Sequence, residues 1–216
     1  MSIESQLCIT VILISIPIAG ILLRLIYILP FTTQTKSINN FKSIKHLKNK
    51  HISIFLGSGG HTGEMLKLTS KLDLNDIKTT WIYSKGDIAT LNQIKQKGFA
   101  NTKSIHRAKN VGDSIPKAIF NSIYSIIDAF ITLYNVKSDL IIMNGPGTSF
   151  ILAFAIFIMK FFGLNSTKII YIESLARSKK LSLTGRLILP ISDRFIVQWE
   201  NLANQYNRVE YYGILL

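Results

Sequence analysis

The sequence predicts an α/β protein in which a transmembrane helix precedes a doubly wound parallel sheet. Two patterns lead to this prediction. From residue 51 onward, short isoleucine-rich segments alternate with longer helical patterns, as in successive βαβ units with right-handed crossovers. Residues 7–29 are almost wholly apolar, and a helix of that length would be about 34 Å long, enough to cross a bilayer.

The first 29 residues are interpreted as a retained membrane anchor. A cleaved signal peptide is the alternative, but the first six residues contain no basic side chain and include Glu4. The nearby lysines all follow the apolar segment, so the positive-inside rule places the chain from residue 30 onward in the cytosol and the N-terminus across the membrane. Pro17 is expected to kink the helix, and the side chain of Arg24 is expected to extend to the membrane interface.

Residues 30–50 form a basic juxtamembrane segment, which is either a solvated linker or a contact for anionic headgroups. The formal net charge of the whole chain is +13 at pH 7, which indicates nucleic acid, an anionic membrane or a phosphorylated substrate as a partner. The basic residues are spread along the chain without a recognition motif, so nucleic acid is disfavoured. The single cysteine, Cys8, excludes an intrachain disulfide.

Residues 51–216 are expected to form the folded domain. Strands are predicted at 51–56, 78–84, 103–106, 139–143, 168–173, 194–199 and 208–212, and helices at 60–72, 88–97, 116–134, 148–162 and 183–189. The segments 115–134 and 150–162 are apolar around most of the helix circumference. Such helices are either buried in a core or in contact with lipid, and both interpretations remain open.

The turn Gly57-Ser58-Gly59-Gly60, between the first strand and the first helix, is the main candidate binding site. Its glycines let a ligand approach the backbone, and the N–H groups at the start of a helix attract anions. His61 follows directly, and a histidine can exchange a proton near neutral pH. The turn departs from the nicotinamide dinucleotide fingerprint and lacks the ending of a P-loop, so both of those nucleotide-binding classes are disfavoured.

A second glycine turn, Asn144-Gly145-Pro146-Gly147-Thr148, also lies between a strand and a helix. In a parallel sheet the two turns would open into one crevice. Glu173 ends a strand at the same edge, and with Arg177 it is either part of the site or a surface ion pair. Glu64 would repel a phosphate and is interpreted as a positioning or acceptor-hydroxyl contact. The sequence has no Asp-x-Asp motif, metal-binding cluster or G-x-S-x-G elbow, so no metal or cofactor is expected.

Taken together, these motifs resemble a known family, the membrane-anchoring subunits of the two-subunit N-acetylglucosaminyltransferase that adds the second sugar to the dolichol-linked precursor of asparagine-linked glycosylation. The glycine-histidine turn alone is also similar to that of the bacterial enzyme that glycosylates a lipid-pyrophosphate muramyl acceptor. The likeness covers essentially the whole chain. It rests on Gly57–Leu66, Asn144–Thr148, Tyr171–Ser174 with Ala176–Arg177, Leu181–Gly185, Asp193–Trp199 and Tyr212–Leu216.

The resemblance implies the Rossmann-like, acceptor-binding half of a split GT-B glycosyltransferase. It would be a single-pass protein of the endoplasmic reticulum membrane, with a luminal N-terminus and its domain on the cytosolic face. A soluble subunit would supply the half that binds UDP-N-acetylglucosamine. The apolar C-terminal tail is expected to dock that partner, with packing back onto its own domain as the alternative. The tail residues are Tyr211, Tyr212, Ile214, Leu215 and Leu216.

The resemblance also suggests where the acceptor, N-acetylglucosaminyl-pyrophosphoryl-dolichol, would bind. The residues assigned to its pyrophosphate are Gly57, Ser58, Gly59, Gly60, Thr62, Asn144, Gly145, Gly147, Thr148 and Arg177. The sugar 4-hydroxyl must lose a proton as it attacks the donor, giving an inverted β1,4 linkage. His61 is the first candidate for the general base, followed by Glu64 and Glu173; alternatively, His61 only hydrogen-bonds the pyrophosphate. A non-catalytic membrane scaffold and a nucleotide-binding oxidoreductase are the other function classes considered.

Overall fold

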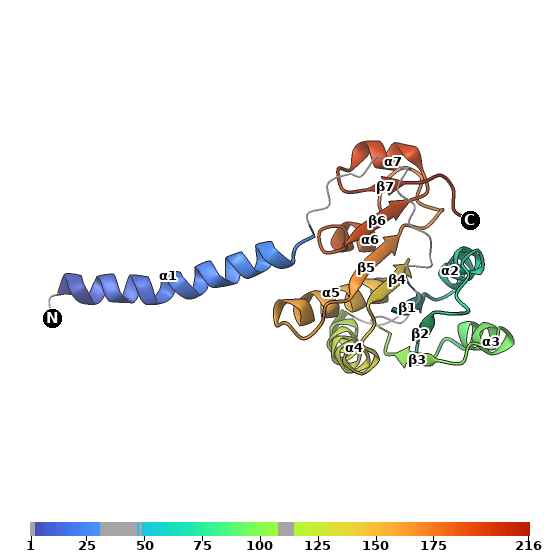
Figure 1. The fold of residues 1–216 in the computed structure, drawn as a ribbon, viewed down its shortest axis with the longest axis horizontal. Coiled ribbons are helices and arrows are strands. Elements are labelled where there is room, and N and C mark those ends of the chain that lie inside the picture. Colours follow the sequence, from blue (N-terminus) through green and yellow to red (C-terminus); the bar gives the residue numbers. More distant parts are fainter. Residues whose placement is uncertain (1–2, 31–46, 48, 108–114) are drawn as a thin grey trace.

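The computed structural model describes residues 3–30, 47, 49–107 and 115–216, which form a long N-terminal helix and an α/β domain (Figure 1). Helix α1, Ile3–Ile28, projects away from the domain. Its segment Val11–Ile28 is long and apolar enough to cross a membrane, and none of it is buried against the rest of the chain. Most of the predicted basic segment, 30–50, lies outside the described residues.

The domain alternates strands with helices, as the sequence predicts. The strands are β1 His51–Leu56, β2 Lys78–Ser84, β3 Thr102–Ile105, β4 Leu140–Asn144, β5 Lys168–Ile172, β6 Arg194–Val197 and β7 Glu210–Tyr211. The helices are α2 Gly60–Ser70, α3 Ile88–Gln96, α4 Ile115–Val136, α5 Gly147–Phe161, α6 Leu183–Ile188 and α7 Glu200–Gln205. The predicted elements are all present within a few residues of their expected ends. Helix α7 was not predicted, because its six residues are mostly polar and Leu202 alone is buried, so the segment shows no hydrophobic period.

These strands form one parallel sheet in the order β3-β2-β1-β4-β5-β6-β7. The strand order reverses between β1 and β4, because the chain first moves outward from β1 to β3 and then returns to the other side of β1. Ligands of such sheets bind at the carboxyl ends of the strands where the order reverses. The predicted doubly wound sheet is confirmed, and both glycine turns lie at its reversal point.

An apolar core lies on each face of the sheet. Leu56 of β1 and Met65 of α2 belong to the core on one face, whereas Phe55 of β1 and Leu133 of α4 belong to the core on the other. Eight residues of α5 are buried, so the apolar character of this helix is explained by the core rather than by lipid. Helix α4 differs from α5, since it buries one side and leaves apolar side chains exposed on the other.

Arg24 attaches α1 to the domain. Its Nε atom donates to the carbonyl oxygen of Phe161 at 2.9 Å, and its Nη2 atom donates to that of Lys160 at 2.7 Å. Carbonyl groups in the last turn of a helix have no partner within that helix. Arg24 therefore caps α5, and its placement at a membrane interface stays a prediction.

The C-terminal tail packs in part on its own domain. Leu215 lies against the core beside α2, and its carbonyl oxygen accepts a hydrogen bond from Nζ of Lys71 at 2.8 Å. The hydroxyl of Tyr212 donates to Glu210 at 2.6 Å. Ile214 is 55% exposed. Leu215 and Tyr212 thus pack back onto their own domain, as in the alternative considered from the sequence. Docking of a partner on the exposed part of the tail stays a prediction.

Candidate active site

The two glycine turns are in contact at the carboxyl ends of β1 and β4. A Cβ atom on Gly57 would lie 2.6 Å from Cδ of Pro146, and a Cβ atom on Gly145 would lie 2.3 Å from Cγ of His61. Gly145 also has a φ of 75°, which favours glycine. The absence of side chains at these positions lets the imidazole of His61 rest directly on the second turn.

The outer part of the first turn is open. Gly59, with a φ of 64°, precedes α2, which begins without a side-chain cap. A Cβ atom on Gly59 or Gly60 would meet nothing within 4 Å. Because the first N–H groups of a helix lack partners within the helix and carry its positive dipole end, this start of α2 can receive a phosphate group.

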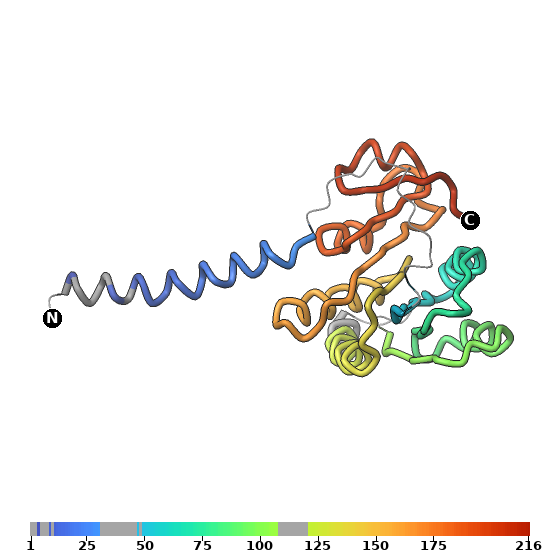
Figure 2. Tube along the Cα trace, viewed as in Figure 1, coloured from blue at the N-terminus to red at the C-terminus, as the bar shows by residue number. Residues whose placement is uncertain are grey.

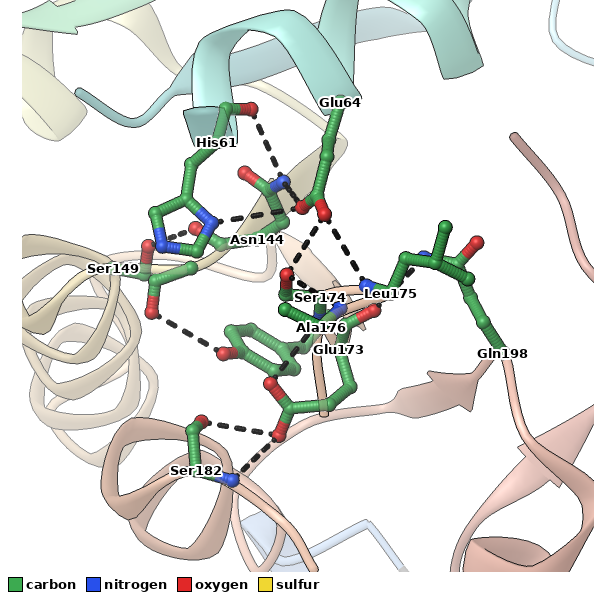
Figure 3. A network of polar contacts seen from close by, with 12 residues as sticks. His61, Glu64, Asn144, Ser149, Glu173, Ser174, Leu175, Ala176, Ser182 and Gln198 are labelled. Atoms are coloured by element: carbon green, nitrogen blue, oxygen red, sulfur yellow. Dashed lines mark hydrogen bonds and ion pairs between the residues drawn. The ribbon is translucent and has the colours of Figure 1, made fainter. Parts of the chain in front are cut away.

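His61 and Glu64 face each other from successive turns of α2 (Figure 3). Nδ1 of His61 lies 3.6 Å from Oε2 of Glu64, is buried, and has no hydrogen-bond partner among the described residues. A neutral imidazole carries its proton on one nitrogen, and the carboxylate favours Nδ1 for it. Nε2 then keeps the basic lone pair. The side chain of His61 is 34% exposed, so the rest of the ring can meet a substrate.

Glu64 is occupied by positioning contacts. Its Oε1 atom accepts from the hydroxyl of Ser174 at 2.8 Å and from the amide of Leu175 at 3.2 Å, while Oε2 accepts from Nδ2 of Asn144 at 3.3 Å. Burial opposes the charge of Glu64, but the nearby His61 ring and hydrogen bonds from Ser174 and Leu175 outweigh this effect and lower the pKa of Glu64. An ionised carboxylate with a lowered pKa is a weak base, so Glu64 serves to join α2 to the loop after β5.

Asn144 holds the start of α2 in place. Its Nδ2 atom donates to the carbonyl oxygen of His61 at 3.2 Å as well as to Glu64. Both neighbours are acceptors, so the amide nitrogen must face them. The residue is 1% exposed. Asn144 is therefore a positioning residue, and its assignment to the pyrophosphate is not supported by these contacts.

The expectation that Glu173 is a candidate base in the crevice is wrong. The residue is 1% exposed. Its Oε2 atom accepts from the amide and the hydroxyl of Ser182, both at 3.0 Å, and Oε1 accepts from the amide of Ser174 at 3.2 Å. Burial raises the pKa of Glu173, although these hydrogen bonds oppose the shift. The loop 174–182 folds over the carboxylate, so Glu173 anchors that loop and cannot reach a substrate.

Replacing Gly185 tests this anchoring. A Cβ atom at Gly185 would lie 2.3 Å from Oε2 of Glu173, so Gly185→Ala is expected to lower the free energy of unfolding by about 1–3 kcal/mol, as overpacked cores do. Urea unfolding of the protein in detergent measures the change. Gly63→Ala is the control, because a Cβ atom there meets nothing within 4 Å and alanine favours a helix. Equal stability of the two variants contradicts the packing described for Glu173.

Two threonines assigned to the pyrophosphate have buried side chains. The hydroxyl of Thr62 is hydrogen-bonded to that of Thr90 at 2.7 Å, and both residues are 1% exposed. Thr148 is 3% exposed. Their hydroxyl groups are thus enclosed by protein, and a contact of either residue with the pyrophosphate, which stays a prediction, would use the backbone N–H group. Arg177 is exposed on the loop after β5, where its positive charge partly offsets the rise in the pKa of the buried Glu173.

Arg107 was not among the predicted site residues. Its Nη2 atom donates to the hydroxyl of Ser58, which places a guanidinium group beside the first glycine turn. One feature of the sequence could have indicated Arg107 as a site residue: it lies two residues after β3, at the same edge of the sheet as the glycine turns. The strand order that brings it near Ser58 could not be read from local sequence.

Comparison with known proteins identifies related chains. A family model described as "Oligosaccharide biosynthesis protein Alg14 like" matches residues 52–215. The UDP-N-acetylglucosamine transferase subunit ALG14 of Candida albicans is 47% identical over 221 residues, and that of Debaryomyces hansenii is 44% identical over 234 residues. Both matches cover 100% of this chain and 100% of the relative.

Solved structures with the same fold include MurG of Acinetobacter baumannii, with a TM-score of 0.57 and 14% identity, and a UDP-N-acetylglucosamine 2-epimerase, with a TM-score of 0.53 and 12% identity. The matches cover 76% and 74% of this chain but only 45% and 44% of those proteins. Similarity at this identity concerns the fold alone. It confirms the predicted Rossmann-like sheet of the type found in GT-B glycosyltransferases.

Proposed function

This chain belongs to the Alg14-like family of oligosaccharide biosynthesis proteins, and we propose that it is the membrane-anchored, acceptor-binding subunit of a UDP-N-acetylglucosamine transferase. The observation that carries the proposal is the pairing of an open, uncapped helix start with His61 at the reversal point of the sheet. An anion-binding site beside a basic side chain suits an acceptor that carries a pyrophosphate and a reacting hydroxyl.

The proposed reaction needs a second subunit. The relatives are named as subunits, and the matched part of this chain covers 45% of MurG. A soluble partner would bind UDP-N-acetylglucosamine and cover the crevice at the carboxyl ends of the strands, where the glycine turns lie. Helix α1 would hold the domain at the cytosolic face of the endoplasmic reticulum, where it meets N-acetylglucosaminyl-pyrophosphoryl-dolichol.

His61 acts as the general base in this proposal. The acceptor 4-hydroxyl gives its proton to Nε2 while its oxygen attacks C1 of the donor sugar. UDP leaves with the electrons of the broken C1–O bond, which inverts C1 and produces a β1,4 linkage. Glu64 stabilises the imidazolium that forms, because its carboxylate lies 3.6 Å from Nδ1 and its other contacts hold it in place.

The acceptor pyrophosphate binds at the amides of Gly59 and Gly60, with Arg107 as a nearby cation. Arginine is suited to this position because its planar guanidinium can bind two phosphate oxygens at once. Glu64 does not oppose the phosphate strongly, since its carboxylate is directed toward Ser174 and Leu175 instead.

Acceptor binding by the chain without its partner tests the proposal. In calorimetry with detergent-solubilised protein, a short-chain prenyl-pyrophosphoryl-N-acetylglucosamine is expected to bind, whereas UDP-N-acetylglucosamine is not. Arg107→Gln should weaken acceptor binding by about 10- to 100-fold, the range for a lost hydrogen bond to a charged group. Lys103→Gln, at an exposed position of β3, is the control and should bind normally. Binding of the nucleotide sugar in place of the acceptor contradicts the proposal.

A further inference from the structure

Helix α4 is apolar on both of its sides. Ala129 and Leu133 are buried in the core. On the other side, a group of apolar and aromatic side chains, called here the α4 face, is more than half exposed; it consists of Ile123, Tyr124, Ile127, Ile131 and Tyr134. Their spacing of about four residues places them along one stripe of the helix. An exposed apolar stripe of this length marks a surface that is covered in the working protein.

A second apolar surface, called here the α5 corner, consists of Phe162 and Leu164. These side chains follow the end of α5 and are 68% and 59% exposed. Arg24 binds the carbonyl oxygen of Phe161 directly before the corner. Because Arg24 belongs to the apolar segment Val11–Ile28, the corner lies beside the last turns of that segment, not beyond its end.

Helix α4 runs across the direction of α1. In Figure 1, α1 lies in the plane of the view, while α4 is seen along its axis. The trace in Figure 2 has the same arrangement, with α4 and α5 on the side of the domain from which α1 emerges. When α1 crosses a bilayer, α4 therefore runs along the membrane surface rather than into it.

We propose that the α4 face and the α5 corner lie in the interfacial layer of the bilayer that α1 spans, and that Arg24 sets their depth. The inference rests on the proposed function only in requiring that α1 span the membrane. Helices in this layer bury an apolar face at the boundary between headgroups and acyl chains, where tyrosine side chains are favoured. Lipid, and not a protein, covers the two surfaces in this proposal because the α5 corner adjoins α1. The net charge of +13 also favours contact with an anionic membrane surface.

Fluorescence quenching by lipid tests the proposal. Cys8→Ser removes the single native thiol, and single cysteines are then introduced by Ile127→Cys, Phe162→Cys, Ile14→Cys and Lys95→Cys. Each is labelled with an environment-sensitive dye in nanodiscs that contain anionic lipid, with or without lipids carrying a nitroxide near the headgroup. Ile14 reports α1, and Lys95, on the exposed surface of α3, is the control away from the membrane.

Dyes at positions 127 and 162 are expected to lose most of their emission with nitroxide lipid, and the dye at 95 is expected to lose little. Arg24→Gln should restore part of the emission at 162 and leave that at 14 unchanged. If the dye at 14 is quenched while the dyes at 127 and 162 behave like the dye at 95, the inference is overturned, although α1 still spans the membrane. If the dyes at 127 and 162 are shielded from aqueous iodide but not quenched by lipid, protein and not lipid covers them, and the inference is likewise overturned. If nitroxide lipid does not quench the dye at 14, α1 does not span the membrane, and the inference is overturned with it.

Discussion

Replacing His61 by alanine is expected to lower the turnover of the complex with its donor-binding partner by about 10²- to 10⁴-fold, the usual contribution of a general base. The imidazole is partly exposed, rests on Gly145 and faces Glu64 through its buried Nδ1 atom. Alanine keeps the helix and the amides of the glycine turn, so the protein should fold and bind acceptor. Steady-state transfer of labelled N-acetylglucosamine measures the change.

Comparison of turnover with acceptor affinity identifies the role of His61. A base affects the turnover number and leaves acceptor affinity nearly unchanged. If His61→Ala instead weakens acceptor binding and leaves turnover at saturating acceptor intact, the imidazole binds the pyrophosphate. Glu64→Gln should lower turnover less than His61→Ala, because the amide keeps an oxygen to accept from Ser174 but loses the charge that stabilises the imidazolium.

The variant Gly145→Ala should reduce turnover almost as strongly, although it leaves every candidate catalytic side chain in the sequence. The new Cβ atom would lie 2.3–2.7 Å from three atoms of the His61 ring. The ring must therefore rotate off the second turn and away from Glu64. The φ of 75° at this position adds a backbone cost of about 1–2 kcal/mol for a residue other than glycine.

Gly98→Ala is the matched control for the backbone cost. Gly98 has a φ of 68° but open space around its Cβ position, so the substitution introduces the same kind of strain without displacing an imidazole. Both variants should lower the melting temperature, and only Gly145→Ala should lose turnover in protein that is still folded. Retained turnover in folded Gly145→Ala contradicts the placement of His61 described above.

The elements that local sequence predicted well are those with a clear apolar period. The β1 strand, the glycine turn and α2 follow from an apolar run, successive glycines and a helical pattern within twenty residues. The position of both glycine turns at the carboxyl edge of a parallel sheet follows from the alternation of strands and helices. Hence His61 and the first turn could be placed in a crevice without a structure.

The parts of the site that sequence did not predict depend on contacts between distant segments. The end of β5 directs Glu173 toward the crevice, but the loop that contains Ser182 covers it. No local pattern indicates that cover. The same holds for Arg107, which reaches Ser58 from the far side of β2, and for Glu64, whose partners lie on the loop after β5.

The central claim, that this chain supplies part of the active site, is tested most directly with a water-soluble acceptor. Transfer from UDP-N-acetylglucosamine to a short-chain prenyl-pyrophosphoryl-N-acetylglucosamine is measured with the donor-binding partner alone and with the partner plus this chain. Such an acceptor needs no recruitment to a membrane. We expect no transfer by the partner alone and transfer when this chain is added. Full transfer by the partner alone would contradict the claim and would leave this chain as a membrane scaffold.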